Sequence, residues 1–165
     1  MQNYDSGAAH DDYVRAAEIL QLRKDYKRAN TAYDRAISLN SKSIPALLGR
    51  GNLYLTRGEE IASIADFDMV VRLDKRNLQG YLGLGQARHD LGYFKKAVKH
   101  FKDARSIDSK NPMIHKYLML SYFGANDFKQ VRKSYDKFLK YASEAEIEEM
   151  RADSRFGPIL RVAEN

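Results

Sequence analysis

The sequence has 165 residues, no cysteine and a formal net charge of +6, which fits about one globular domain and excludes disulfides and thiolate metal sites. Hydrophobic residues make up 44% and charged residues 30% of the chain, a composition typical of a folded protein rather than a disordered one. No apolar run approaches the roughly 18 residues of a membrane span, and the first ten residues lack the basic and apolar regions of a signal peptide. We leave open a cytoplasmic location or, in a bacterium, an envelope or periplasmic one reached by a targeting segment since removed.

In chain order, the sequence divides without gaps into units spaced by 34 residues, which begin at His10, Ile44, Leu78 and Pro112. Each unit predicts two helices. The expected ranges are 10–23, 26–39, 44–57, 60–73, 78–91, 94–107, 112–125 and 128–141. The motif Ser143-Glu144-Ala145-Glu146 is a capping box, which predicts a ninth helix over about 144–152.

The aligned columns of the four units predict how paired helices pack. Small residues dominate one column of the first helix and two columns of the second: Ala17, Gly51, Gly85 and Met119; Ala29, Ser63, Ala97 and Val131; Ala36, Val70, Ala104 and Phe138. A column of large aromatic residues lies between the latter two: Tyr33, Phe67, Phe101 and Tyr135. An aromatic ring that fills a gap left by small neighbours is the expected packing unit.

Further columns mark where helices begin and end. The turn within each unit carries Lys24, Gly58, Gly92 or Asn126, and Gly and Asn tolerate the left-handed backbone that ends a helix. Pro45 falls in the first turn of its helix, where a missing N–H costs little, and Pro112 does the same two units later.

This pattern resembles the tetratricopeptide repeat family over about residues 10–141, and the third unit matches it best through Tyr81, Leu84, Gly85, Phe94 and Ala97 among others. The resemblance implies an all-α, right-handed solenoid of four helix-turn-helix repeats with a C-terminal capping helix. The expected organisation is: N-terminal tail 1–9, repeats 10–43, 44–77, 78–111 and 112–142, capping helix and tail 143–165. The fourth repeat is the least faithful to the family, and its bulky residues are interpreted as a seat for the capping segment.

The residues indicate no catalysis, cofactor or metal. The four histidines form no pair at helical spacing, and neither His10-Asp11-Asp12 nor His100 with Asp103 offers enough ligands for a metal. Gly83-Leu84-Gly85 lacks the third glycine and the preceding strand of a dinucleotide loop. We therefore expect a chain that is not an enzyme, has no small-molecule substrate and binds another polypeptide.

The family resemblance implies that the first helices line a concave groove, which would take a peptide or an amphipathic helix of a partner protein, as in the assembly of a larger secretion, pilus or envelope complex. The candidate groove residues are Leu48, Asn52, Leu55, Gln79, Leu82, Gln86, His89, Lys116, Leu120 and Phe123. The alternative for each leucine is an ordinary place in the core, and the chain's own tail, residues 156–162, is another candidate occupant of the groove.

Some members of the family bind the C-terminal carboxylate of chaperones with Lys, Arg and Asn side chains in this groove. The present sequence retains only Asn52 in a matching column, because Leu48, Gly83, Met113 and Tyr117 occupy others. The resemblance therefore argues against a carboxylate clamp in this chain.

Charge is concentrated in residues 94–140, where twelve Lys and Arg face four Asp, a net charge of +8. The candidate basic patch comprises Lys95, Lys99, Lys102, Lys129, Arg132, Lys133 and Lys137, all on second helices. Such a patch could bind an acidic protein or an anionic membrane surface, which defines the alternative function of an electrostatic adaptor. The lysines lack an aromatic stacking platform, which argues against nucleic acid. The sequence leaves the oligomeric state and the identity of the partner open.

Overall fold

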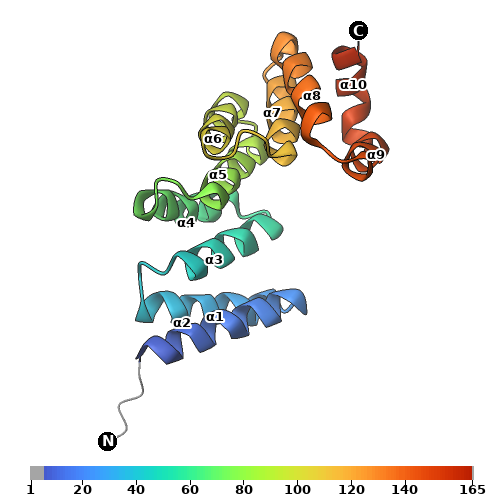
Figure 1. Ribbon diagram of the computed structural model, residues 1–165. Helices are drawn as coiled ribbons and strands as arrows, with labels where there is room; N and C mark the ends of the chain where they lie inside the picture. Colours follow the sequence, from blue (N-terminus) through green and yellow to red (C-terminus); the bar gives the residue numbers. More distant parts are fainter. Residues whose placement is uncertain (1–5, 165) are drawn as a thin grey trace, which may run out of the picture. The chain divides into compact units, whose positions relative to one another are not determined.

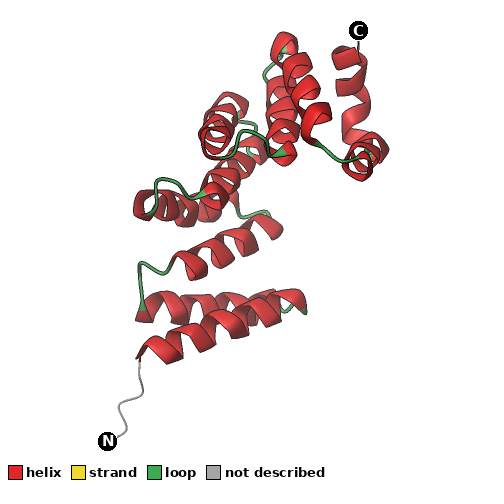
Figure 2. Ribbon diagram, viewed as in Figure 1, coloured by secondary structure: helices red, strands yellow, loops and turns green. Residues whose placement is uncertain are grey.

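The computed structural model describes residues 6–164, and this part of the chain is built from α-helices joined by short loops (Figures 1 and 2). The helices are α1 Ser6–Leu22, α2 Tyr26–Leu39, α3 Ile44–Thr56, α4 Glu60–Leu73, α5 Leu78–Asp90, α6 Phe94–Ile107, α7 Pro112–Gly124, α8 Phe128–Tyr141, α9 Glu144–Ala152 and α10 Gly157–Glu164, with a 3-10 turn at Ser154–Phe156. The all-α class and the two helices expected in each unit are confirmed.

The helix boundaries agree with the 34-residue period to within one residue from α2 to α9. The first helix differs, because α1 begins at Ser6 rather than at His10. The expected tail over 1–9 is therefore corrected for residues 6–9, which are helical, while residues 1–5 lie outside the described part. Ala8, Ala9 and the residues after them favour helix, so the helix extends past the start of the repeat.

Two compact units make up the chain, one ending at Gly83 and the other starting at Leu84. In the first unit α1 packs against α2, α3 packs against α4, and α3 also contacts both α1 and α2. In the second unit α7 contacts α6 and α8, and α10 contacts α8 and α7. Packing therefore joins helices within a repeat and helices of consecutive repeats inside the same unit.

The aromatic column forms the centre of both units. Tyr33, Phe67, Phe101 and Tyr135 expose at most 5% of their surface. Phe67 lies between two glycines: a Cβ at Gly51 would meet the ring at 2.9 Å, and a Cβ at Gly83 would meet it at 2.5 Å. One ring therefore fills the space between the first helix of its own repeat and that of the next.

Phe101 repeats this arrangement in the second unit with one change. A Cβ at Gly85 would lie 2.4 Å from its ring, so only glycine fits on that side. On the other side Tyr117 replaces the glycine, and its ring stacks on Phe101 with centroids 5.1 Å apart and planes 2° apart. The fourth repeat thus accepts a large residue in this column because the two rings lie flat against each other.

The turn column adopts the left-handed backbone that its residues predict. The φ angles are 61° at Lys24, 71° at Gly58, 75° at Gly92 and 59° at Asn126. Lys24 takes this conformation without being glycine or asparagine, which places about 1 kcal/mol or more of strain in the first turn.

The C-terminal segment contains one helix that the sequence did not predict. The capping box at Ser143 and Glu146 is formed, and α9 follows it as expected. Residues 157–164, expected as a tail, form α10. Ile159 of this helix and Phe156 just before it are both buried. The Tyr135 hydroxyl donates a 2.7 Å hydrogen bond to the Glu164 carboxylate. Helix α10 contacts α8, so it covers the last second helix of the repeat array.

Candidate functional site

A cleft of about 760 Å³ lies on the first helices of the first unit, between the end of α1, the start of α2 and α3. Its lining residues are Glu18, Gln21, Leu22, Lys24, Tyr26, Tyr33, Pro45, Leu48, Gly49, Asn52 and Thr56. A cleft of this size is in the usual range for ligand sites, about 300–1,000 Å³. Two of the candidate groove residues, Leu48 and Asn52, are part of its lining.

Tyr33 and Gly49 form the floor of this cleft. A Cβ at Gly49 would lie 2.4 Å from the Tyr33 ring, so glycine is what allows α3 to approach α2 here. The Tyr33 hydroxyl donates a 3.1 Å hydrogen bond to the Gln21 side-chain oxygen. Burial, with the nearby Glu18 carboxylate, raises the pKa of Tyr33 to about 12, so the hydroxyl stays a donor at neutral pH.

The walls of the cleft combine apolar and amide groups. Leu48 is half-buried, Leu22 is 85% exposed, and Asn52 is exposed on the same helix as Leu48, one turn on. An apolar surface edged by amides can take an apolar side chain of a polypeptide while pairing its backbone N–H and C=O groups.

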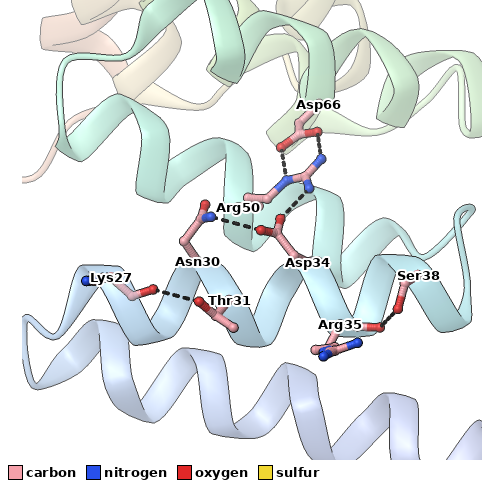
Figure 3. A network of polar contacts seen from close by, with 8 residues as sticks. All are labelled: Lys27, Asn30, Thr31, Asp34, Arg35, Ser38, Arg50 and Asp66. Carbon is pink, nitrogen blue, oxygen red and sulfur yellow. Dashed lines mark hydrogen bonds and ion pairs between the residues drawn. The ribbon is translucent and has the colours of Figure 1, made fainter.

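Arg50 fixes α3, the helix that carries Leu48 and Asn52, to its two neighbours (Figure 3). Its Nε and Nη2 donate to the two oxygens of Asp66 on α4 at 2.9 and 2.7 Å, and its Nη1 donates to Asp34 on α2 at 2.7 Å. The hydrogen bonds to Asp66, opposed by burial, raise the pKa of the Arg50 guanidinium further above its ordinary value. The fork geometry sets the rotation of α3, and with it the direction of the cleft wall.

A second cleft of about 460 Å³ lies on the first helices of the second unit. Its lining residues are Gln86, His89, Asp90, Gly92, Phe94, Lys116, Tyr117, Leu120 and Arg155. Lys116 forms a 3.8 Å ion pair with Glu149 of α9, and Arg155 donates to Asp153 at 3.0 Å. Cations and carboxylates are therefore mixed here, which gives the cleft no single sign of charge.

His89 is a fixed, uncharged part of the second cleft. Its Nδ1 lies 3.1 Å from the Ser121 hydroxyl, and its ring meets Phe94 edge-on with centroids 5.2 Å apart. Burial, partly offset by Asp90, lowers the pKa of His89. At neutral pH it offers a hydrogen-bonding imidazole rather than a charge.

The ten candidate groove residues separate into three sets. Six line the two clefts: Leu48, Asn52, Gln86, His89, Lys116 and Leu120. Three lie beyond the lining of either cleft, Gln79 exposed and Leu55 and Phe123 half-buried. Leu82 is 8% exposed and offers little surface to a ligand. Tyr33 and Arg155 were missed; the column alignment places Tyr33 in the core, and Arg155 lies outside the repeats, where no column exists.

The seven residues of the basic patch are all exposed, on α6 and α8 of the second unit. Lys95, Lys99 and Lys102 lie on α6, and the remaining four on α8. Over residues 6–164 no group of three or more His, Asp or Glu side chains could hold a metal ion. Within the same range, every helix is too short or too polar to cross a bilayer.

Comparison with known proteins agrees with this architecture. A sequence model described as tetratricopeptide repeat matches residues 78–111. The MamA protein structure superposes with a TM-score of 0.81 over 94% of this chain and 83% of that one, at 18% identity. Residues 78–111 thus match a tetratricopeptide repeat, and the chain has the fold of tetratricopeptide repeat proteins. A thermophilic tetratricopeptide repeat protein of Thermus thermophilus has the same fold, with a TM-score of 0.72, 21% identity and coverage of 93% and 87%.

The chain matches parts of larger proteins. It is 29% identical over 98 residues to small glutamine-rich tetratricopeptide repeat-containing protein 2 of Mycosarcoma maydis, which covers 59% of this chain and 28% of that protein. It is 26% identical over 132 residues to DnaJ homolog subfamily C member 7 of Homo sapiens, with coverage of 73% and 27%. The chain thus spans less than a third of the length of the curated relatives it matches.

Proposed function

We propose that this chain is a protein–protein interaction scaffold that binds a peptide or helical segment of a partner on the faces of its first helices, and that it is not an enzyme. The observation that carries the proposal is the cleft between α1 and α3, with a buried tyrosine floor, the half-buried Leu48 and the exposed Asn52. Apolar anchors of the partner would enter this cleft, and amides would pair with its backbone.

The family supports this mode of binding. The first tetratricopeptide repeat domain of Spaghetti (RPAP3), whose structure is described as bound to the HSP90 peptide SRMEEVD, superposes on 72% of this chain and 94% of that one with a TM-score of 0.70, at 14% identity. At that identity the likeness covers the fold alone. The ligand of the present chain has to be argued from its own residues.

Those residues favour a ligand other than a chaperone C-terminus. Of the clamp columns only Asn52 carries a matching residue. Gly83 packs against Phe67, where a larger side chain would collide with the ring, and Tyr117 stacks on Phe101. A basic clamp residue in either column would disrupt the aromatic core, so we propose that the partner is anchored by apolar side chains instead. We further propose that this binding serves the assembly of a larger secretion, pilus or envelope complex.

A phage-displayed library of random peptides, selected on the immobilised chain, tests this proposal. Selected peptides should carry apolar anchors and bind the purified chain in fluorescence anisotropy, and they should bind the Leu48→Glu and Asn52→Ala variants at least tenfold more weakly. Thr31→Glu, on the exposed face of α2, is the matched control for charge. Circular dichroism verifies that each variant is folded. Selected peptides that bind all variants alike would refute the cleft as the site.

The alternative is an electrostatic adaptor, favoured by the exposure of all seven residues of the basic patch on α6 and α8. A partner held there would be acidic, and its affinity would fall steeply with ionic strength, because screening shortens the reach of exposed charges to about 8 Å at physiological salt. Lys95→Glu/Lys99→Glu would weaken such binding and leave cleft peptides unaffected. Binding that persists in high salt and tolerates this variant would exclude the adaptor.

A further inference from the structure

The outward face of α4 differs from that of the other second helices. Spacing of four residues places Ile61, Ala65, Met69 and Leu73 on one face of α4, and all four are exposed, Ile61 by 78% and Met69 by 40%. The opposite face is the buried one, with Phe67 and Val70 at its centre. Helix α4 is therefore apolar toward solvent as well as toward the core.

The 34-residue register shows what the fold itself needs at these positions. The columns of Ile61, Ala65 and Met69 hold mostly charged residues in the other second helices: Lys27, Thr31 and Arg35 in α2; Lys95, Lys99 and Asp103 in α6; Lys129, Lys133 and Lys137 in α8. Since three helices of the same fold carry polar residues there, packing within the repeat does not demand apolar ones. An exposed run of large apolar side chains is the usual mark of an interface.

From this we infer that α4 is a self-association surface, on which the α4 of a second copy of this chain lies antiparallel. Charge along the helix selects this occupant. Glu60 and Glu59 stand at the N-terminal end of α4, where Glu59 pairs with Arg57 at 2.7 Å, and Arg72, Lys75 and Arg76 stand at or just beyond the C-terminal end beside Asp74, so the two ends carry opposite net charge. Antiparallel pairing about a two-fold axis brings the acidic end of each copy to the basic end of the other, twice.

The side chains of the stripe complement themselves in the same pairing. With the two-fold axis near Phe67, Ile61 lies opposite Leu73 of the second copy, and the small Ala65 leaves room for Met69. Small and large residues thus alternate across the seam, as close helix packing at about 8–10 Å requires. Residues 44–93 carry no net charge, with six basic and six acidic side chains, so like-charge repulsion does not oppose the contact.

The expected dimer is weak. A seam of one short helix with its flanks lies near the lower limit of stable interfaces, about 1,000 Å² in total. We therefore expect a concentration-dependent monomer–dimer equilibrium rather than an obligate dimer. The cleft lining contains none of the four exposed apolar residues of α4, so the inference stands independently of the proposed peptide binding.

Sedimentation velocity of the full chain, from about 1 to 300 μM to span the micromolar range typical of weak complexes, tests the proposal. The mass should rise from 19.0 kDa toward twice that value. Ile61→Lys/Met69→Lys, which places basic residues where α2 has Lys27 and Arg35, should stay monomeric at every concentration while remaining folded by circular dichroism. Thr31→Lys/Ser38→Lys adds the same charge to exposed positions of α2 and should dimerise like the wild type.

The absence of cysteine provides a second, geometric test. Ala65→Cys should be cross-linked between copies by a short bismaleimide, and the exposed control Thr31→Cys should not. Lys75→Glu should weaken the dimer, and Glu59→Lys/Lys75→Glu should restore it. A chain that is monomeric throughout, which would leave α4 to a different protein, overturns the proposal, as does a dimer that survives the α4 lysine variant.

Discussion

Removing the Arg50 side-chain charge tests how α3 is held in the first unit. In Arg50→Met the apolar stem remains, but the Asp66 carboxylate, whose side chain is 6% exposed, loses both of its guanidinium hydrogen bonds. Breaking a buried pair in this way costs about 3–5 kcal/mol when both partners are fully buried. The Arg50 side chain is 20% exposed, so water screens part of the loss and we expect about 2–4 kcal/mol.

The same network contains its own internal comparison. Asp34 is 48% exposed and also accepts a 3.0 Å hydrogen bond from Asn30, so Asp34→Asn should cost no more than about 1 kcal/mol. Arg50→Met/Asp66→Leu removes the stranded carboxylate and should be more stable than Arg50→Met alone, because a buried pair replaced by apolar groups is often neutral.

Urea denaturation followed by circular dichroism measures these free energies of unfolding, and hydrogen exchange locates them. Exchange in Arg50→Met should accelerate in α2, α3 and α4 and stay unchanged in α8 and α10, because each repeat contacts only its neighbours. A loss in Arg50→Met no larger than in Asp34→Asn would refute the reasoning that burial of Asp66 sets the cost. So would a double variant less stable than Arg50→Met.

Three further predictions concern the second unit. Gly85→Ala should lower the free energy of unfolding by about 1–3 kcal/mol in urea denaturation, because its Cβ would lie 2.4 Å from the buried Phe101 ring. Gly157→Ala, whose Cβ would meet no atom within 4 Å, should be neutral or stabilising by up to about 1 kcal/mol. Equal effects of the two substitutions would contradict the packing argument. Burial lowers the pKa of His115, an effect partly offset by its contact with the Ser109 carbonyl. As the pH falls, the unfolded chain therefore binds the proton first, and thermal stability should decline below pH 6.5, the ordinary pKa of histidine. His115→Gln should show a shallower decline, and an unchanged slope would refute this. Deleting 156–165 removes the buried Phe156 and Ile159 and should lower the melting temperature, and an unchanged temperature would show that α10 does not stabilise the array.

Much of the fold could be predicted because a repeat tests every assignment four times. The aromatic column of Tyr33 and Phe67 alternates with small residues at a fixed offset, and only paired helices at that spacing bring the two together. The helix ends could be predicted equally well, because Gly58 and Asn126 lie at the positions where a residue in the left-handed conformation ends the helix. The groove candidates came from the family resemblance, carried over column by column, and six of the ten line the two clefts.

The features that were not predicted lie outside the aligned repeats, or at columns whose residues have different surroundings in different repeats. Helix α10 occurs once, starts with Gly157-Pro158 and is eight residues long, so it offers neither a repeat nor a long periodic pattern. Gly83 was considered only as part of an incomplete dinucleotide motif and as a clamp column without a basic residue. Its contact with the Phe67 ring depends on how consecutive helices stack, which the period alone does not specify. Leu82 shares a groove column with Leu48, yet it is nearly buried, because exposure depends on the local neighbours of each helix.

The two faces of the first unit illustrate how one repeat register can present two kinds of surface. On α3 the residues between the packing columns, Leu48 and Asn52, border a cleft whose floor is made by the core tyrosine itself. On α4 the residues between the packing columns, Ile61 and Met69, are apolar where most of the other second helices carry charged side chains, while Phe67 keeps its place in the buried face. Since Phe67 already fills the core between Gly51 and Gly83, the residues on either outer face are not constrained by core packing and can differ according to the partner. The departures from the charged pattern of the other repeats, rather than the shared columns, therefore carry the information about what this chain binds.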